Sequence, residues 1–129
     1  MSITSPRLLF NDTVLGNLAA AAESAVCQLN GVSTQGPGAS VHLTGRVELQ
    51  GTTGATNLVI RVRRGAGVGG AEVSSQSVVF CGVGDNTEAV IIVVDVPGDV
   101  ADLPYTLTAQ VQGASGATTV DRACLTALY

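Results

Sequence analysis

The sequence predicts an all-β fold, an antiparallel sandwich or barrel of about eight strands. Two observations carry this prediction: apolar and polar residues alternate over many short runs, and Gly, Pro, Asn and Asp separate these runs. Alternation with a period of two is typical of half-buried strands, because successive side chains of a strand point to opposite faces. The chain has 129 residues, which suits one domain, so we expect residues 1–129 to form a single sandwich.

The first forty residues show the weakest pattern. The segment PRLLF (6–10) is compatible with a short strand, and GVSTQGPGAS (31–40) is typical of a loop. The segment NLAAAAESA (17–25) has two interpretations, a short helix with Asn17 as its N-cap or an irregular strand. Residues 1–40 could therefore belong to the sandwich or act partly as an N-terminal arm over a neighbouring subunit.

The middle of the chain alternates clearly. The segment VHLTGRVELQ (41–50) places its Val and Leu residues on one face and polar residues, His42 among them, on the other. Residues 51–57 are typical of a hairpin loop, and NLVIRVRR (57–64) and AEVSSQSVVF (71–80) each predict a strand. The segment AVIIVVDV (89–96) is almost continuously β-branched and apolar, which predicts a strand covered on both faces.

The last third of the chain continues the pattern. PGDVADLP (97–104) predicts a loop, YTLTAQVQ (105–112) an alternating strand, and GASGATT (113–119) a turn. VDRACLTALY (120–129) predicts a strand that runs to the last residue. Because this strand would be part of the sheet, removal of residues 125–129 is expected to damage the fold.

One glycine-rich segment, RVRRGAGVGGAEV (61–73), raises the question of nucleotide binding. Gly65, Gly67 and Gly70 have the spacing of a dinucleotide-binding fingerprint. That fingerprint needs a helix directly after the glycines, because the pyrophosphate binds at the helix N-terminus. Residues 71–80 are strand-like instead, so we interpret the glycines as a flexible connection between two strands.

Composition and charge restrict the possible partners. The net charge is −4 and the chain has no lysine, which argues against nucleic-acid binding. The longest apolar run, residues 89–94, is too short to span a bilayer, and the first residues lack the pattern of a signal peptide. Charged residues make up only 12% of the chain against 46% hydrophobic residues. This balance favours a surface partly hidden in an oligomer, with a neutral surface of Ser, Thr, Gly and Ala as the alternative.

The residues that carry most enzymatic chemistry are scarce. His42 is the single histidine, and no nucleophile, zinc or phosphate-loop motif is present. The cysteines are odd in number without CxxC spacing, which predicts reduced, buried thiols at Cys27, Cys81 and Cys124. The loop carboxylates do not match a calcium loop and are assigned to turns and solubility: Asp85, Glu88, Asp95, Asp99 and Asp102. We therefore expect no enzyme, no catalytic, cofactor-binding or metal-binding residue, and no small-molecule substrate.

Three segments of the second half together resemble small bacteriophage virion proteins with a TNF-like jelly-roll fold. They are LVIRVRRG, VVDVPGDVADLPYTLTAQVQG and TTVDRACLTALY, and the resemblance covers residues 58–129. It implies a jelly roll of about eight strands, a homotrimer, and a place in the virion as a capsid decoration (cement) protein or a tail knob. The chain is short and has no shaft or coiled-coil segment, which favours decoration.

The leading hypothesis is therefore a structural protein that is made in the host bacterial cytoplasm and binds the major capsid protein on the capsid surface. A protein that binds only the assembled shell would stabilise it. The alternative is a tail or fibre knob that binds a host receptor or glycan through residues 51–57, 82–88 and 113–118. A cupin-like metal enzyme is a third hypothesis, which the single histidine argues against.

The candidate residues for a subunit or capsid interface are arginines and tyrosines, types that are enriched at interfaces. For the arginines of residues 61–64, the alternative is a strand face paired with Glu48 or Glu72. The candidates are Arg61, Arg63, Arg64, Arg122, Tyr105 and Tyr129.

Overall fold

The computed structural model describes residues 7–14, 17–80 and 82–129. These residues form eight strands and one short 3-10 helix. The bounds are β1 Leu8–Asn11, β2 Ser24–Thr34, β3 Val41–Gln50, β4 Asn57–Arg64, η1 Gly67–Gly69, β5 Ala71–Val79, β6 Asn86–Asp95, β7 Val100–Gln112 and β8 Val120–Leu128. In the described part of the chain, no helix could cross a membrane.

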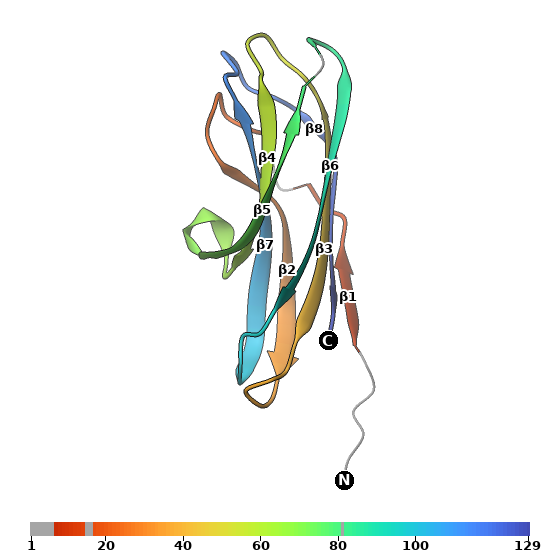
Figure 1. Cartoon of the computed structure of the whole chain (residues 1–129), viewed down its shortest axis with the longest axis vertical. Coiled ribbons are helices and arrows are strands. Elements are labelled where there is room, and N and C mark those ends of the chain that lie inside the picture. Colours follow the sequence, from red (N-terminus) through yellow and green to blue (C-terminus); the bar gives the residue numbers. More distant parts are fainter. Residues whose placement is uncertain (1–6, 15–16, 81) are drawn as a thin grey trace.

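The strands form two four-stranded antiparallel sheets that face each other as a sandwich (Figure 1). One sheet has the order β1-β8-β3-β6 and the other β2-β7-β4-β5. The first strand pairs with the last, the second with the seventh, the third with the sixth and the fourth with the fifth. This nested pairing is that of a jelly roll, so the predicted all-β jelly roll of eight strands is confirmed.

The core lies between the two sheets, as the alternation predicts. On β3, four inward side chains have no exposed surface: Val41, Leu43, Val47 and Leu49. Across the sandwich, Leu58, Ile60 and Val62 of β4 are buried equally well. Gly45 lies at the centre of β3, where a Cβ atom would come within 2.8 Å of a methyl group of Leu107 on β7. The glycine therefore allows the sheets to approach closely at this point.

The prediction for residues 89–96 was wrong about burial. Among the described strands, β6 is an edge strand that pairs only with β3, and its side chains alternate between the core and the surface. Ala89 and Ile91 face the core, whereas Val90, Ile92 and Val94 are 43%, 78% and 51% exposed. The continuous apolar run therefore covers one buried face and one open face.

Two loop assignments also need correction. Residues 51–57 do not form a hairpin, because β3 and β4 belong to different sheets and this segment crosses between them. Residues 97–104 are only partly loop, since β7 begins at Val100. Asp102, with φ of 52°, lies where the register between β2 and β7 shifts. Such an irregularity permits a strand at a sequence that resembles a loop.

The N-terminal segment joins the sandwich over its described part. β1 pairs with β8 and β2 pairs with β7, so both strands belong to the fold of their own chain. The segment 17–25 contains no helix. Leu18 forms an isolated bridge with Thr118, and β2 begins at Ser24, which favours the irregular-strand interpretation. For the rest of the predicted N-terminal arm, residues 1–6 lie outside the described residues.

Candidate functional site

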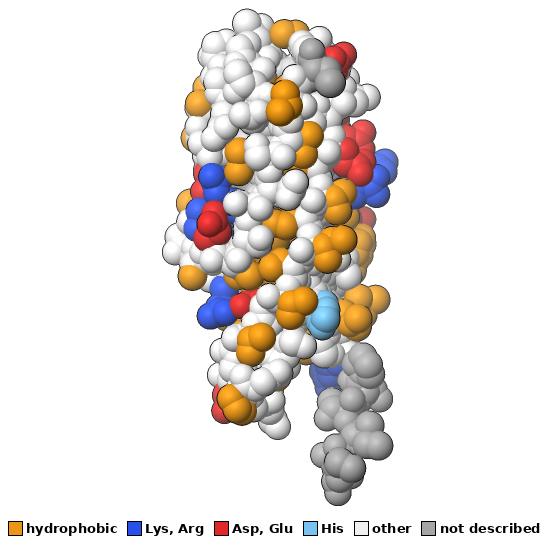
Figure 2. All heavy atoms as spheres, viewed as in Figure 1, with side chains coloured by type: hydrophobic (Ala, Val, Ile, Leu, Met, Phe, Trp, Pro, Cys, Tyr) orange, Lys and Arg blue, Asp and Glu red, His pale blue; other side chains and the backbone are white. Residues whose placement is uncertain are grey.

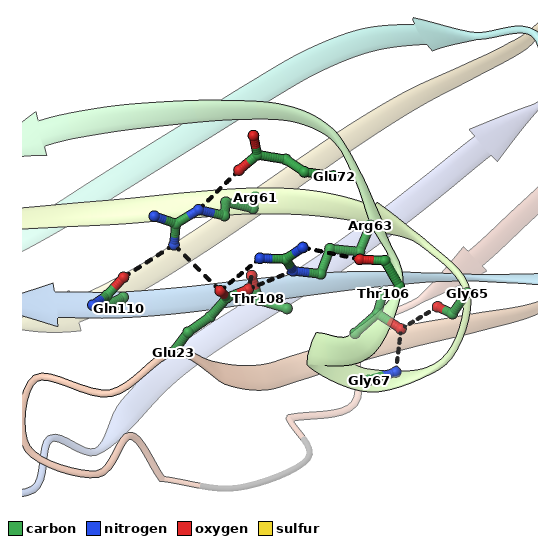
Figure 3. Close-up of polar contacts among 10 residues, drawn as sticks. Glu23, Arg61, Arg63, Gly65, Gly67, Glu72, Thr106, Thr108 and Gln110 are labelled. Atoms are coloured by element: carbon green, nitrogen blue, oxygen red, sulfur yellow. Dashed lines mark hydrogen bonds and ion pairs between the residues drawn. The ribbon is translucent and has the colours of Figure 1, made fainter.

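A network of ion pairs lies on the outer face of the β2-β7-β4-β5 sheet (Figure 3). Arg63 of β4 binds Glu23 through two hydrogen bonds, each of 2.7 Å. Arg61, two residues earlier on the same face, lies 2.9 Å from Glu72 of β5 and 3.6 Å from Glu23. The Thr108 hydroxyl donates a further hydrogen bond of 2.6 Å to Glu23. One carboxylate thus gathers donors from two neighbouring strands.

The charges of this network balance within the chain. Glu23, Arg61 and Arg63 expose only 17–19% of their side chains. The hydrogen bond from Arg63 lowers the pKa of Glu23 below its ordinary value, and Glu23 in turn raises the pKa of Arg63. Two guanidinium groups face two carboxylates, so this surface offers no free positive charge to an anionic partner. The predicted pairing with Glu72 is confirmed for Arg61, whereas Arg63 pairs with Glu23 and Glu48 lies on β3 in the other sheet.

The glycine-rich segment connects β4 to β5, which pair as antiparallel neighbours. The Gly67 N–H donates to the Thr106 hydroxyl at 3.0 Å, and this hydroxyl donates to the Gly65 carbonyl at 2.8 Å. At Gly70, a Cβ atom would lie 2.5 Å from the Arg64 carbonyl oxygen. The glycines therefore allow a tight turn between strands, and η1, with three residues, gives no helix N-terminus for a phosphate. The interpretation as a strand connection is confirmed.

A second ion pair links the two sheets. Arg64 binds both carboxylate oxygens of Asp95, one of them at 2.8 Å, and the Tyr105 hydroxyl donates to the same carboxylate at 2.6 Å. Asp95 is 6% exposed and Tyr105 is fully buried. Burial alone would raise the pKa of Asp95, but hydrogen bonds from Arg64 and Tyr105 hold it below its ordinary value. Burial and the neighbouring carboxylate raise the pKa of Tyr105.

The structure therefore does not bring the six predicted interface residues together. Tyr105 lies inside the sandwich, and its side chain is out of reach of any partner because it is fully buried; its hydroxyl donates to the buried carboxylate of Asp95. Arg122 is exposed on β8, opposite Glu48 of β3. The Tyr129 hydroxyl donates to the Gly31 carbonyl at 3.2 Å, beside a pocket that Arg7 also lines. The arginines of β4 remain near the surface but are paired within the chain.

The opposite outer face, on the β1-β8-β3-β6 sheet, carries exposed hydrophobic side chains that sequence reasoning missed. The register places them in two rows across the four strands. One row is Phe10, Thr126, Thr44 and Ile92, and the next is Leu8, Leu128, His42 and Val94. Leu8, Phe10 and Leu128 are 66%, 59% and 45% exposed. Together with Val90 on β6, the hydrophobic members of these rows form what we term the apolar face.

Figure 2 shows the single histidine of this face between hydrophobic side chains. Its cross-strand neighbours are Val94 on β6 and Leu128 on β8. The charged residues of the same sheet begin farther along, where Arg46 pairs with Glu88 at 2.8 Å. The apolar face therefore has a charged border at one end.

The three loops assigned to the alternative knob function meet at one end of the sandwich (Figure 1). The Gly84 N–H donates to the Gly51 carbonyl at 2.9 Å, and the Ser115 N–H donates to the Thr53 carbonyl at 3.1 Å. At Gly54, a Cβ atom would lie 2.5 Å from the Gly113 carbonyl oxygen. Backbone contacts thus hold these loops against one another.

The remaining candidates for chemistry lie apart. Among the described residues, no group of three or more His, Cys, Asp or Glu side chains could hold a metal ion. Cys27 and Cys124 are free thiols, and Cys81 lies outside the described residues. The Cys27 thiol donates to the Asn11 carbonyl at 3.1 Å, and burial raises its pKa to about 11. This thiol is therefore protonated and inert at neutral pH.

No known protein family and no curated protein sequence matches this chain. Solved structures of infectious bursal disease virus share its fold. The crystal structure of the T13 viral particle matches with a TM-score of 0.58 at 9% identity, over 95% of this chain and 31% of that chain. The Gx strain structure matches with a TM-score of 0.57 at 10% identity, over 96% of this chain and 32% of that chain.

A third match, the VP2 subviral particle of the same virus, has a TM-score of 0.54 at 11% identity and covers 95% of this chain. This chain spans 31–32% of the length of the viral chains that it matches. At such low identity the likeness concerns the fold alone. A β-sandwich of the type found in virus particles is therefore supported, and the resemblance to bacteriophage proteins stays a prediction.

Proposed function

We propose that this chain is a structural virion protein, a bacteriophage decoration protein that binds the assembled capsid shell as a homotrimer and stabilises it. One observation carries the proposal: the apolar face exposes hydrophobic side chains on three of its four strands. Clustered exposed apolar side chains on a soluble domain are typical of a surface for protein contact. When a partner covers such a surface, the removal of apolar side chains from water stabilises the complex.

The contrast between the two outer faces supports this assignment. On the β2-β7-β4-β5 sheet, Glu23 and Thr108 satisfy the arginines within the chain. On the other sheet, Phe10 and Ile92 have no such partners and are 59% and 78% exposed. Non-obligate interfaces have few charges at their centre and a polar rim. The apolar face, bordered by the Arg46–Glu88 pair, has this composition.

The fold and the net charge are compatible with a place on a virus particle. Solved structures of infectious bursal disease virus contain the same fold, which supports a shell-associated role. The net charge of −4 would keep the protein away from packaged nucleic acid. Stabilisation needs no catalytic group: at a free concentration 100 times Kd, each bound copy stabilises the assembled shell by about 2.7 kcal/mol.

Co-sedimentation with shells tests the proposal directly. Shells of the virus that encodes the chain, prepared without it, are mixed with the purified protein, and both shell binding and the shell melting temperature are measured. We expect the wild type to bind and to raise the melting temperature. Phe10→Lys should weaken binding at least tenfold, because it places a charge on the apolar face.

Ser77→Lys, on exposed β5 in the other sheet, is the matched control and should bind like the wild type. The proposal is overturned if the wild type does not bind shells at micromolar concentrations. Binding to host cells or to a glycan array without binding to shells would favour the knob alternative instead.

A further inference from the structure

β6 is the longer of the two edge strands of its sheet; it runs close to β5 of the other sheet but lacks the sequence features that protect natural edges. It pairs with β3 over ten consecutive residues without a register shift. Among the described residues, no backbone hydrogen bond joins β6 to any strand other than β3. Exposed edges in monomeric proteins are usually short, bulged, or interrupted by lysine or proline. β6 contains neither residue.

The two edges of the other sheet, β2 and β5, show the contrast, and the pairing of β2 with β7 has three register shifts. β5 carries the polar run Ser74–Ser75–Gln76–Ser77, has Glu72 near its start, and shows a register shift against β4. β1, the other edge of the β6 sheet, has only four residues. Within the described part of the chain, β6 is therefore the one edge that is long, regular and apolar.

The sequence of β6 is complementary to itself. The segment from Ala89 to Val94 reads AVIIVV. If two copies lie antiparallel with Ile92 opposite Ile92, each Val90 faces the Val94 of the other copy on the outer side. This arrangement places apolar side chains opposite one another at about 4.5–5.5 Å between Cβ atoms.

Charge is compatible with the same register. Each copy has a net charge of −4, so two copies repel each other at long range. Glu88 is the only charged residue on the outer side of β6, and its carboxylate pairs with Arg46 at 2.8 Å. Centred on Ile92, the pairing places each Glu88 opposite the exposed Val96 of the other copy and away from its carboxylates.

We propose that two copies of this chain join through their β6 edges in a two-fold antiparallel pair, which extends the β1-β8-β3-β6 sheet into a continuous sheet of eight strands. The contact uses the same surface on both copies, so it closes and does not propagate into a filament. It also places the two apolar faces side by side as one surface. The inference does not depend on the proposed function, and a trimer would use other contacts, giving a complex of two trimers.

Mass in solution, by light scattering after size-exclusion chromatography, tests the pairing. The wild type should contain an even number of chains. Ile92→Lys should halve the mass, because it places two ammonium groups directly opposite each other. Ile92 is 78% exposed, so the variant should remain folded, which circular dichroism checks. Ser77→Lys on β5 is the matched control and should keep the wild-type mass.

A charge-swap experiment tests the register. Ile92→Lys and Ile92→Glu should each have half the wild-type mass when alone, and their mixture should recover the full mass. A wild-type mass of one or three chains overturns the edge pairing, and three chains would leave the proposed function standing. Unchanged mass of Ile92→Lys, or no recovery in the mixture, also overturns it. If the wild type contains an even number of chains but does not bind shells, the proposed function alone is refuted.

Discussion

The Tyr105 hydroxyl offers a quantitative test of the buried cluster that joins the two sheets. It donates a hydrogen bond of 2.6 Å to Asp95, a carboxylate that is 6% exposed. Tyr105→Phe removes this bond with little change in shape. A hydrogen bond to a charged group contributes about 1.5–3 kcal/mol, and Arg64 still binds the carboxylate, so we expect a loss of about 2 kcal/mol. For a domain of this size that corresponds to a fall in Tm of about 7 °C.

Tyr129→Phe is the matched control, because it removes the same atom from a different setting. The Tyr129 hydroxyl donates to a neutral acceptor, the Gly31 carbonyl, at 3.2 Å. Loss of a partly buried, neutral hydrogen bond costs about 1 kcal/mol. Urea unfolding of the wild type and both variants at pH 7 therefore should rank Tyr105→Phe as about twice as destabilising.

The pH dependence separates the two variants further. The hydrogen bonds hold the pKa of Asp95 below its ordinary value in the folded chain. This stabilisation is complete above the pKa of the unfolded chain, about 3.9, and is lost as the pH falls through the folded-state pKa. The cost of Tyr105→Phe should thus stay constant down to about pH 4 and shrink as the pH falls further, whereas the cost of Tyr129→Phe should not depend on this titration. Equal costs at pH 7, or a constant cost for Tyr105→Phe, would refute the role of the cluster.

Three further predictions concern the rest of the chain. Glu23→Gln should lower the free energy of unfolding by about 1–3 kcal/mol, measured by urea titration, because it leaves Arg63 without its carboxylate; an unchanged midpoint would contradict this. Removal of residues 125–129 should yield insoluble protein, since β8 lies between β1 and β3; a soluble, cooperative product would contradict it. Cys27 should resist iodoacetamide at pH 8 in the folded chain and react only after unfolding. Cys124 is partly exposed and should react first. Peptide mass mapping measures the extent of reaction at each cysteine.

Much of the fold could be predicted from the sequence, because alternation reports directly which side chains face a core. The alternation of β3, β4 and β7 correctly predicts which of their apolar side chains lie between the sheets. The partner of each strand could not be identified in this way. Residues 51–57 have the composition of a hairpin loop, yet they cross between the two sheets. Loop composition indicates that the chain turns, but it does not identify the strand with which the next strand pairs.

The arginine network was predictable only in part. The spacing of Arg61 and Arg63 places both on one face of a strand, and Glu72 lies close enough in sequence to be considered. Glu23 could not be found, because it follows an alanine-rich segment with no clear periodicity and reaches Arg63 only through the fold. Forty residues separate this pair in sequence.

The wrong burial prediction for β6 points to a contact surface. A run of six apolar residues normally indicates a strand buried on both faces. In this chain, Val90, Ile92 and Val94 lie on an open face although Ser or Thr would fit there, as Thr44 does on the neighbouring strand β3. Burial within one chain cannot account for these three residues, since their side chains are exposed there. Contact in an assembly can, because the side chains of a partner strand paired at the β6 edge would pack beside these residues, and Ile92→Lys tests whether that interface exists.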